Sequence, residues 1–309
     1  MTDHTALLAK RRGRAKNAIS CTRSTKKPRR GKAAIQELCD AMYKLCKEEH
    51  PLTIRHVFYR MSILKLVKKL EGEYKGAICR LLTKMRKGKR LPFHWITDNT
   101  RWRMKPNTYS SLGDALDNMQ RDYRRALWDN QNDYIEVWTE KDAISSILYP
   151  ITSKWDVPLM TARGYCSQSF LYSVAEDITQ IGKPTYLYYF GDHDPSGVDA
   201  RRFVEETIRK YAPDAEVHFE LVAVTREKID EWDLPTRPTK KSDTRAKNFI
   251  GESVEVDAVP PSKLRELVTN VIEQHVDEWQ LERMQEVEAA ERETLQTMIE
   301  NMQGGNANE

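Results

Sequence analysis

The spacing of apolar side chains divides the chain into two regions with different periods. Between residues 33 and 127 the apolar residues recur at every third or fourth position, which predicts amphipathic helices. From residue 134 onward, short runs rich in β-branched and aromatic residues alternate with helical segments. Such alternation predicts an α/β region with a largely parallel sheet. We therefore expect a fold of the α/β plus α class.

The first region predicts three helices and one short strand. The first helix is closed by Pro51, the second begins at the N-cap residue Thr53, and the third covers residues 74–85. A strand is then expected over 91–97, entering a turn at Asp98-Asn99. Three helices followed by a basic strand and a turn are typical of a winged-helix (CAP-like) domain.

The second region predicts strands at 134–139, 158–162, 185–190 and 217–224, and helices near 143–151, 168–181 and 197–211. Ligands of open parallel sheets bind beyond the C-terminal ends of the strands. Two acidic segments fall at such ends: Glu140 follows the first strand, and the loop 191–197 follows the third.

These patterns predict five segments: a disordered basic arm (1–32), a winged-helix DNA-binding domain (33–106), a connecting helix (107–130), an α/β domain (131–225) and a C-terminal extension (226–309). In the extension, residues 263–302 predict one long acidic helix. It is either a dimerisation element or a solvated face, and the sequence does not choose between the two.

The composition excludes several classes of protein. The 309 residues are 39% hydrophobic and 31% charged, and they contain no apolar run long enough to span a membrane and no signal peptide. The five cysteines are scattered, without CxxC pairs or zinc spacing, which favours a reduced cytoplasmic location. No membrane partner is expected.

Positive charge is concentrated in two places, although the net charge is only +4. Residues 1–33 hold eleven Lys and Arg, among them Arg29 and Arg30, against one acid, Asp3. A second group lies on the third predicted helix and its exit: Arg80, Lys84, Arg86, Lys87, Lys89 and Arg90. A solubilising tail and a solvated helix face are the alternatives. As clusters, both favour contact with the phosphates of double-stranded DNA and hence a nucleoid-associated protein.

Three carboxylates are candidate ligands for a metal ion. Glu140 ends the run Ile135-Glu-Val-Trp-Thr-Glu140, and Asp192 and Asp194 lie in Gly191-Asp-His-Asp-Pro-Ser-Gly197. Mg²⁺ prefers oxygen ligands and keeps several waters, so carboxylates at adjacent strand ends suit Mg²⁺ and a phosphate. The alternative is a polar turn in which Asp194-Pro195 starts a helix.

Tyr59 is a candidate nucleophile. On a helical wheel it points roughly 150° away from the mean direction of Ile54, Val57, Phe58 and Met61, so it is not expected in the core. Arg55 lies one turn earlier on the same side, within reach of the phenol or of a bound phosphate. Because a free phenol is about 0.1% ionised at neutral pH, a nucleophilic role needs a cation, a metal or a base nearby.

Together, the two motifs resemble the A subunit of topoisomerase VI and the related transesterase that makes meiotic double-strand breaks. That family pairs a winged-helix domain bearing Arg-x-x-x-Tyr with a TOPRIM domain bearing a glutamate and an Asp-x-Asp-Pro-x-Gly loop. In this chain, Arg55 to Tyr59 match the Arg-x-x-x-Tyr motif, Glu140 matches the glutamate, and Asp192 to Gly197 match the Asp-x-Asp-Pro-x-Gly loop. Order and spacing also agree, over about residues 33 to 225. The chain is similar to a free-standing, shortened A subunit.

The resemblance implies that Tyr59 attacks a DNA phosphate to form a 5′-phosphotyrosyl link, while Glu140, Asp192 and Asp194 hold Mg²⁺. It also implies a homodimer, in which the tyrosine of one subunit meets the metal site of the other. The sequence has no Gly-rich ATP-binding segment, so an ATPase would be a separate B-type subunit that is not evident here.

Two other functions stay open at this point: a TOPRIM nuclease that hydrolyses DNA with metal-activated water, and a non-catalytic winged-helix protein that only binds DNA. Glu255 and Asp257, in the segment 255–261, are interpreted as structural acids.

Overall fold

The computed structural model describes residues 30–97, 105–239, 249 and 251–305, with side chains to residue 302. Contacts divide the chain into two units, Met1–Glu37 and Leu38–Glu309. Of the first unit, residues 30–37 are described, and they include the start of helix α2 (Lys32–Glu49). The expected arm up to residue 29, Arg29 itself and the turn at Asp98-Asn99 lie outside the described residues.

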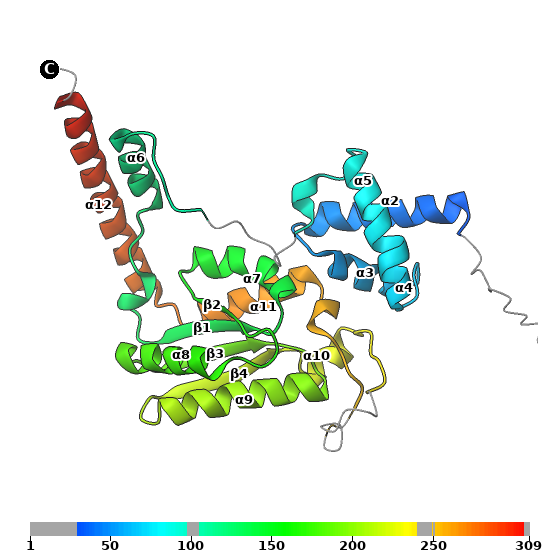
Figure 1. The fold of residues 1–309 in the computed structure, drawn as a ribbon. Helices are drawn as coiled ribbons and strands as arrows, with labels where there is room; N and C mark the ends of the chain where they lie inside the picture. Colours follow the sequence, from blue (N-terminus) through cyan, green and yellow to red (C-terminus); the bar gives the residue numbers. More distant parts are fainter. Residues whose placement is uncertain (1–29, 98–104, 240–248, 250, 306–309) are drawn as a thin grey trace, which may run out of the picture. The chain divides into compact units, whose positions relative to one another are not determined.

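The helices expected in the first region are present. They are α2 (Lys32–Glu49), α3 (Ile54–Ile63), α4 (Glu71–Glu73), a π-helical turn η1 (Tyr74–Cys79) and α5 (Arg80–Lys87). Thr53 caps α3 as predicted, because its hydroxyl accepts a hydrogen bond from the backbone N–H of His56 at 3.3 Å. The third predicted helix is the continuous run from α4 through η1 to α5 (Figure 1).

The strand predicted over residues 91–97 is wrong. This segment forms a 3₁₀ turn, η2 (Phe93–Trp95), and makes a single parallel bridge between Ile96 and Leu52. Leu52 is held there by two backbone hydrogen bonds, to Trp95 and Thr97. A strand needs a neighbour of similar length, and the described part of this region offers only that one residue. The helices of the expected winged-helix domain are therefore confirmed, but its strand is not.

The parallel sheet of the second region is confirmed. Its strands are β1 (Tyr134–Thr139), β2 (Leu159–Thr161), β3 (Thr185–Phe190) and β4 (Val217–Ala223), in the order β2-β1-β3-β4. All three pairings are parallel. In the register, Thr139 at the end of β1 is level with Phe190 at the end of β3. The residues that follow these two strands therefore emerge at the same edge.

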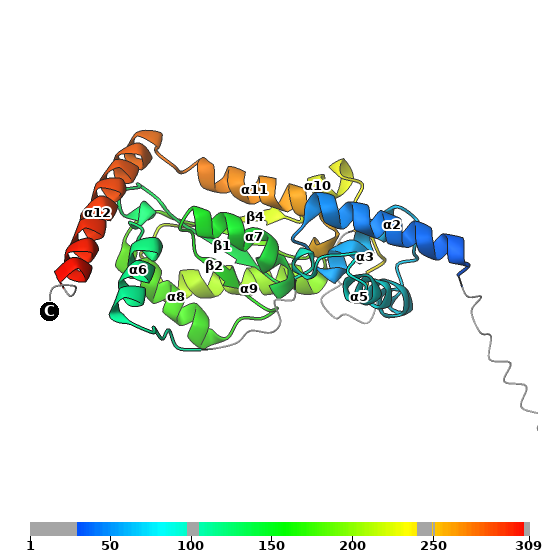
Figure 2. The same cartoon turned by 90° about the horizontal axis from the view of Figure 1, so that it is seen from above.

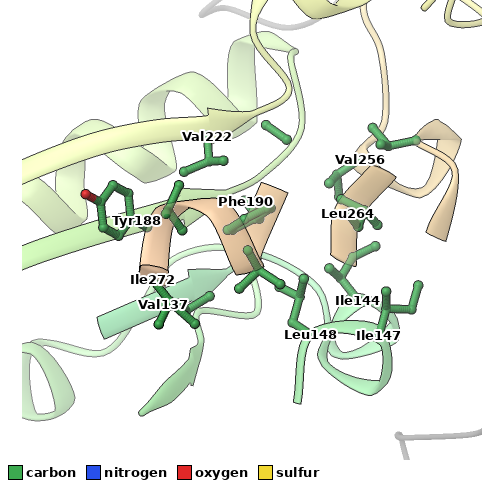
Figure 3. Close-up of a cluster of buried hydrophobic side chains, with 14 of the residues drawn as sticks. Val137, Ile144, Ile147, Leu148, Tyr188, Phe190, Val222, Val256, Leu264 and Ile272 are labelled. Carbon is green, nitrogen blue, oxygen red and sulfur yellow. The ribbon is translucent and has the colours of Figure 1, made fainter. Parts of the chain in front are cut away.

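Helices cover both faces of this sheet (Figures 1 and 2). One face carries α7 (Asp142–Lys154) and α11 (Pro261–Glu273), and the other carries α8 (Gln168–Ile181) and α9 (Pro195–Tyr211). Strands covered on both sides are apolar along their length, which is why they stood out in the sequence. Figure 3 shows the core beneath α7 and α11: Val137, Ile144, Ile147, Leu148, Tyr188, Phe190, Val222, Val256, Leu264 and Ile272.

The remaining elements are α6 (Leu112–Asp122), η3 (Leu127–Asp129), α10 (Arg226–Glu231), η5 (Val256–Ala258) and α12 (Glu278–Gly305). The acidic helical stretch expected over 263–302 is present but is divided into two helices, because α11 ends at Glu273 and α12 begins at Glu278. Asp277 starts the new helix, since its side chain accepts a hydrogen bond from the N–H of Gln280 at 3.0 Å.

The acidic helix α12 packs beside α6 and the segment that follows it (Figures 1 and 2). Glu291 accepts hydrogen bonds from Tyr123 and Arg125, both at 2.6 Å, and Glu288 accepts the N–H of Arg125 at 2.9 Å. Part of its acidic face is therefore neutralised within the chain. No helix in the described ranges is long and apolar enough to cross a membrane.

Glu136 is a buried carboxyl within β1 and gives the sheet a pH-dependent stability. It accepts hydrogen bonds from the indole of Trp138 at 2.8 Å and from the hydroxyl of Tyr134 at 3.2 Å. Burial raises the pKa of Glu136 from 4.5 to about 7, against the effect of these two hydrogen bonds. Between those two values the folded chain holds a proton that the unfolded chain has lost. Glu136 therefore destabilises the fold increasingly as the pH rises from about 4.5 to about 7.

We expect the substitution Glu136→Gln to raise the free energy of unfolding at pH 8 by about 2 to 3 kcal/mol and to change it little at pH 5. The amide keeps an acceptor for Trp138 and has nothing to ionise. Urea denaturation of both proteins at the two pH values measures the difference. A gain of equal size at pH 5 and pH 8 would contradict the assignment, because it would not come from titration.

Candidate functional site

The C-terminal edge of the sheet brings two of the three predicted acids together. Glu140 follows β1, and its backbone N–H bonds to the carbonyl of Phe190 at the end of β3 at 3.0 Å. Its carboxylate turns toward the neighbouring loop and accepts the N–H of Asp192 at 2.9 Å. Glu140 and Asp192 meet because β1 and β3 pair in parallel, which places the ends of both strands at one edge of the sheet.

Asp194 has a capping role in the structure. One of its carboxylate oxygens accepts the N–H of Gly197 at 2.8 Å, which makes Asp194 the N-cap of α9, and Pro195 occupies the first helical position. The other oxygen lies 3.4 Å from a guanidinium nitrogen of Arg237. Asp194 is thus near the acids of the edge, but both of its oxygens already have partners.

Two acids from the C-terminal extension, Glu255 and Asp257, complete the cluster. An antiparallel bridge between Val254 and His193 holds this segment against the loop, with hydrogen bonds of 2.8 and 2.9 Å. The next residue but one, Val256, donates its N–H to Asp192 at 2.8 Å. The sequence interpretation of these two acids as structural did not include their position beside Asp192. Buried acids within the apolar run 254–259 were the available signal, since buried charges need partners.

Lys141 supplies the central positive charge of this cluster. Its ammonium nitrogen lies 2.8 Å from Asp192, 3.1 Å from Asp257 and 3.6 Å from Glu255. The side chain of Asp257 is fully buried, and its second oxygen has no hydrogen-bond partner among the described residues. The arrangement is a buried cation shared by three carboxylates that come from two distant segments of the sequence.

Burial and charge shift the proton affinities of this cluster. Burial raises the pKa of Asp192 to about 7, assisted by the neighbouring Glu140 and opposed by Lys141. Burial also raises the pKa of Glu140. For Lys141, burial favours the neutral amine, but the carboxylates of Asp192, Asp257 and Glu255 outweigh it and raise the pKa of Lys141. Lys141 is therefore charged at neutral pH.

Glu140, Asp192 and Asp194 have the oxygen donors that a Mg²⁺ site needs, but their carboxylates are not arranged around a common point. Carboxylate oxygens are the donors that Mg²⁺ prefers. However, Glu140 accepts a backbone N–H, Asp192 pairs with Lys141, and Asp194 caps α9. Within the described ranges, no group of three or more His, Cys, Asp or Glu side chains is placed so that it could hold a metal ion. The three acids do not form a ready-made metal site, and the ammonium of Lys141 is the cation among them.

Tyr59 is buried, which corrects the expectation that it lies off the core. It is 3% exposed and belongs to the core cluster that includes Val256 and Ala258. The helical wheel describes the direction of Tyr59 relative to the core stripe of α3 itself. It could not show that η5 (Val256–Ala258) packs against α3 and covers Tyr59.

The hydroxyl of Tyr59 points into the acid cluster and donates a hydrogen bond to Glu255 at 2.5 Å. Arg237 lies 2.5 Å from the other oxygen of Glu255, and Arg55 lies 4.0 Å from the oxygen that Tyr59 contacts. The ammonium of Lys69 lies 4.9 Å from the centre of the Tyr59 ring. The structure therefore places Arg55 near Tyr59, as predicted, and adds a carboxylate and two further cations.

These contacts shift the pKa values of Tyr59 and Glu255 in opposite directions. Burial, and then the hydrogen bond and charge of Glu255, raise the pKa of Tyr59 well above its ordinary value. Burial opposes the ionisation of Glu255, but Lys141, the Tyr59 hydroxyl and Arg237 together lower its pKa. At neutral pH the pair therefore consists of a protonated phenol and a carboxylate.

A cavity of about 240 Å³ lies beside the acidic loop. Its lining includes the loop residues Asp192 and His193, the cations Arg201 and Arg226, and the acid Glu227. Burial and the two arginines lower the pKa of His193, so its ring is neutral at pH 7. The charged lining is therefore mixed, with two arginines beside two carboxylates.

The predicted DNA-contacting residues of α5 and its exit lie mostly at the surface. Arg80, Lys84, Lys87, Lys89 and Arg90 are exposed, whereas Arg86 is half-buried, with its guanidinium 5.5 Å from the centre of the Phe93 ring. Arg90 forms an ion pair with Asp40. Arg30 lies in the first unit, at the start of the described residues. The exposed side of α5 is thus strongly basic, as the sequence indicated.

No protein-family model matches this chain, and no curated protein is similar to it in sequence.

Proposed function

We propose that this chain cleaves double-stranded DNA by transesterification, with Tyr59 as the nucleophile, in the manner of the topoisomerase VI A subunit that its motifs resemble. The observation that carries the proposal is the hydrogen bond from the Tyr59 hydroxyl to Glu255, inside a cluster of cations. A tyrosine nucleophile needs a proton acceptor and positive charge nearby, and this hydroxyl has both.

The cations around Tyr59 are the groups suited to a DNA phosphate. The side chain of Arg55 is 45% exposed and that of Arg237 is 35% exposed, and both lie beside Glu255, the acceptor of the Tyr59 hydroxyl. Both guanidinium groups would therefore be available to a phosphate brought to Tyr59. The guanidinium fork binds phosphate oxygens in pairs, which would orient the phosphorus atom for attack.

The basic side of α5 would hold the DNA backbone. Its exposed lysines and arginines carry no sequence information, so they would bind any duplex and lose affinity as the salt concentration rises. We propose a homodimer for a cut in both strands, because one chain provides one Tyr59. Tyr59 contacts the acid cluster of its own chain, whereas the family resemblance implies a contact with the partner subunit.

We keep Mg²⁺ as the expected cofactor, with Glu140, Asp192 and Asp194 as the residues that would be its ligands. In the structure Lys141 pairs with Asp192, and backbone N–H groups bond to Glu140 and Asp194, so no step of the reaction is assigned to the metal ion.

The test is a covalent adduct between protein and DNA. Supercoiled DNA, incubated with the protein and Mg²⁺ and then treated with SDS, is expected to carry the protein on a 5′ end. The substitution Tyr59→Phe should abolish the adduct, because it removes the attacking oxygen and keeps the ring packed in the core. Tyr149→Phe is the matched control, since Tyr149 is 61% exposed and should behave like the wild type.

Two results would replace this proposal with the alternatives. Breaks without an adduct, made equally well by the Tyr59→Phe protein, would indicate a nuclease that hydrolyses DNA through its acids. Binding of DNA without cleavage in any divalent metal, unaffected by loss of Glu140 and Asp194, would indicate a protein that only binds DNA.

A further inference from the structure

Glu255 occupies the position of a base for the Tyr59 hydroxyl. We propose that Glu255 removes the proton from Tyr59 during attack on the phosphate, an inference that rests on the proposed function. Among the residues that the structure describes, Glu255 is the acceptor of the hydrogen bond from this hydroxyl, at 2.5 Å. A general base must lie within hydrogen-bond reach of the proton it removes, and Glu255 does.

The backbone on both sides of Glu255 is fixed, so the carboxylate cannot easily leave Tyr59. Before it, Val254 exchanges two backbone hydrogen bonds with His193. After it, Val256 donates its N–H to Asp192 at 2.8 Å. Arg237 then holds the second carboxylate oxygen at 2.5 Å and leaves the first oxygen directed at Tyr59. Such orientation by a third group is what a nucleophile and base pair requires.

The surroundings of Glu255 keep it ionised at neutral pH, so the oxygen that faces Tyr59 carries no proton. The charged groups around it are Arg55 and Lys69 from α3 and the segment after it, Lys141 from the start of α7, and Arg237 from the segment after α10, with Asp257 of its own segment bonded to the same Lys141. Four are cations and one is an acid. The cations lower the pKa of Glu255 despite its burial, while the pKa of Tyr59 is raised.

Two other titratable side chains near the cluster do not bond to the Tyr59 hydroxyl. The ring of His56 is buried, with Nδ1 2.8 Å from the hydroxyl of Thr53 and with Nε2 lacking a partner among the described residues, and burial lowers its pKa to about 4. Asp192 is bound to Lys141 and to the N–H of Val256.

In the proposed step, the phenol proton moves to a carboxylate oxygen of Glu255 as the phenol oxygen forms a bond to phosphorus. The bond from phosphorus to the 3′ oxygen of the neighbouring nucleotide breaks, and its electron pair stays on that oxygen, which takes a proton from water. The products are a 5′-phosphotyrosyl link, a 3′-hydroxyl, a protonated Glu255 and the hydroxide left by the water. In the reverse step the 3′-hydroxyl gives its proton to hydroxide as its oxygen attacks phosphorus, and Glu255 returns the proton to the Tyr59 oxygen that leaves.

The experiment measures the single-turnover rate of adduct formation between pH 6 and pH 9 for the wild type, Glu255→Gln and Glu252→Gln. The control residue Glu252 is exposed and bonds to Thr236. Glu255→Gln should lower the rate at pH 7 at least 100-fold, in the range for loss of a general base. Its remaining rate should rise with pH, because hydroxide must replace the base. The wild type and Glu252→Gln should show no such rise.

Equal rates and equal pH profiles for the wild type and Glu255→Gln would overturn the inference while leaving the proposed function in place. Absence of any adduct from the wild-type protein would overturn both. If Glu255→Gln does not fold, as judged by thermal unfolding, Glu255→Asp replaces it. The shorter carboxylate should keep the flat pH profile of the wild type at a lower rate, and a profile that rises with pH would count against Glu255 as the base.

Discussion

Replacing Lys141 with methionine is expected to lower the free energy of unfolding by about 3 to 5 kcal/mol at pH 7. The ammonium of Lys141 lies within 3.6 Å of Asp192, Asp257 and Glu255, and the side chain of Asp257 is fully buried. Methionine has a similar length and fills the same space, but it leaves these carboxylates without their shared cation. A buried charge that loses its partner retains the full cost of its desolvation.

Urea denaturation at pH 7 measures this loss. Lys87→Met is the matched control, because Lys87 is exposed on α5 and its loss should change the unfolding free energy by less than about 0.5 kcal/mol. The double substitution Lys141→Met with Asp257→Asn should recover part of the loss, since it removes one of the stranded charges. If Lys141→Met proves as stable as the control variant, the carboxylates do not depend on Lys141 and the cluster described here is not formed in solution.

The sheet could be predicted from the sequence because its strands are defined by their own residues. The bounds expected for the first and third strands agree with β1 (Tyr134–Thr139) and β3 (Thr185–Phe190). Both are buried on both faces, so most of their residues are apolar or aromatic, with Glu136, Thr139 and Thr185 as the exceptions. The same reasoning placed Glu140 and Asp192 at one edge, because parallel strands end together.

The segment 91–97 shows where that reasoning stops. Its composition resembles that of a strand, but a strand exists only when a neighbour supplies the hydrogen bonds. In the structure the neighbour is the single residue Leu52. Residues 274–277, where α11 and α12 separate, are a similar case, because the break depends on contacts of Asp277 with Gln280 and with Gln131, which lies 146 residues away.

Only part of the site around Tyr59 could be predicted from the sequence. Tyr59 and Arg55 share one helix, so their spacing was visible, but Glu255 is 196 residues away from Tyr59. A helical wheel reports which side of a helix a residue occupies and not what covers that side. Neither the burial of Tyr59 nor its acceptor could therefore be inferred. Lys141 was overlooked for the same reason, since its three carboxylates come from two distant segments.

Gly197 is the residue that lets the acidic loop fold against α9, and Gly197→Ala is expected to disrupt both. A β-carbon at this position would lie 2.5 Å from the backbone oxygen of Asp192 and 3.2 Å from its β-carbon. Because the nearest obstacle is backbone, no side-chain rotation relieves the clash, and the loop itself must move. Movement also weakens the 2.8 Å hydrogen bond from the N–H of Gly197 to Asp194, which caps α9.

We expect Gly197→Ala to lower the free energy of unfolding by about 3 kcal/mol, as overpacking in a tight site does. We also expect it to lower the rate of adduct formation roughly 100-fold, because a displacement of about 1 Å in a catalytic group has that effect. Gly76→Ala is the control: a β-carbon there meets nothing within 4 Å, and alanine favours a helix. Urea denaturation and the adduct assay measure the two effects separately. A Gly197→Ala protein of wild-type stability would show that the loop is not packed against α9 as the structure has it. A loss of stability with an unchanged rate of adduct formation would show that the acidic loop takes no part in the reaction of Tyr59.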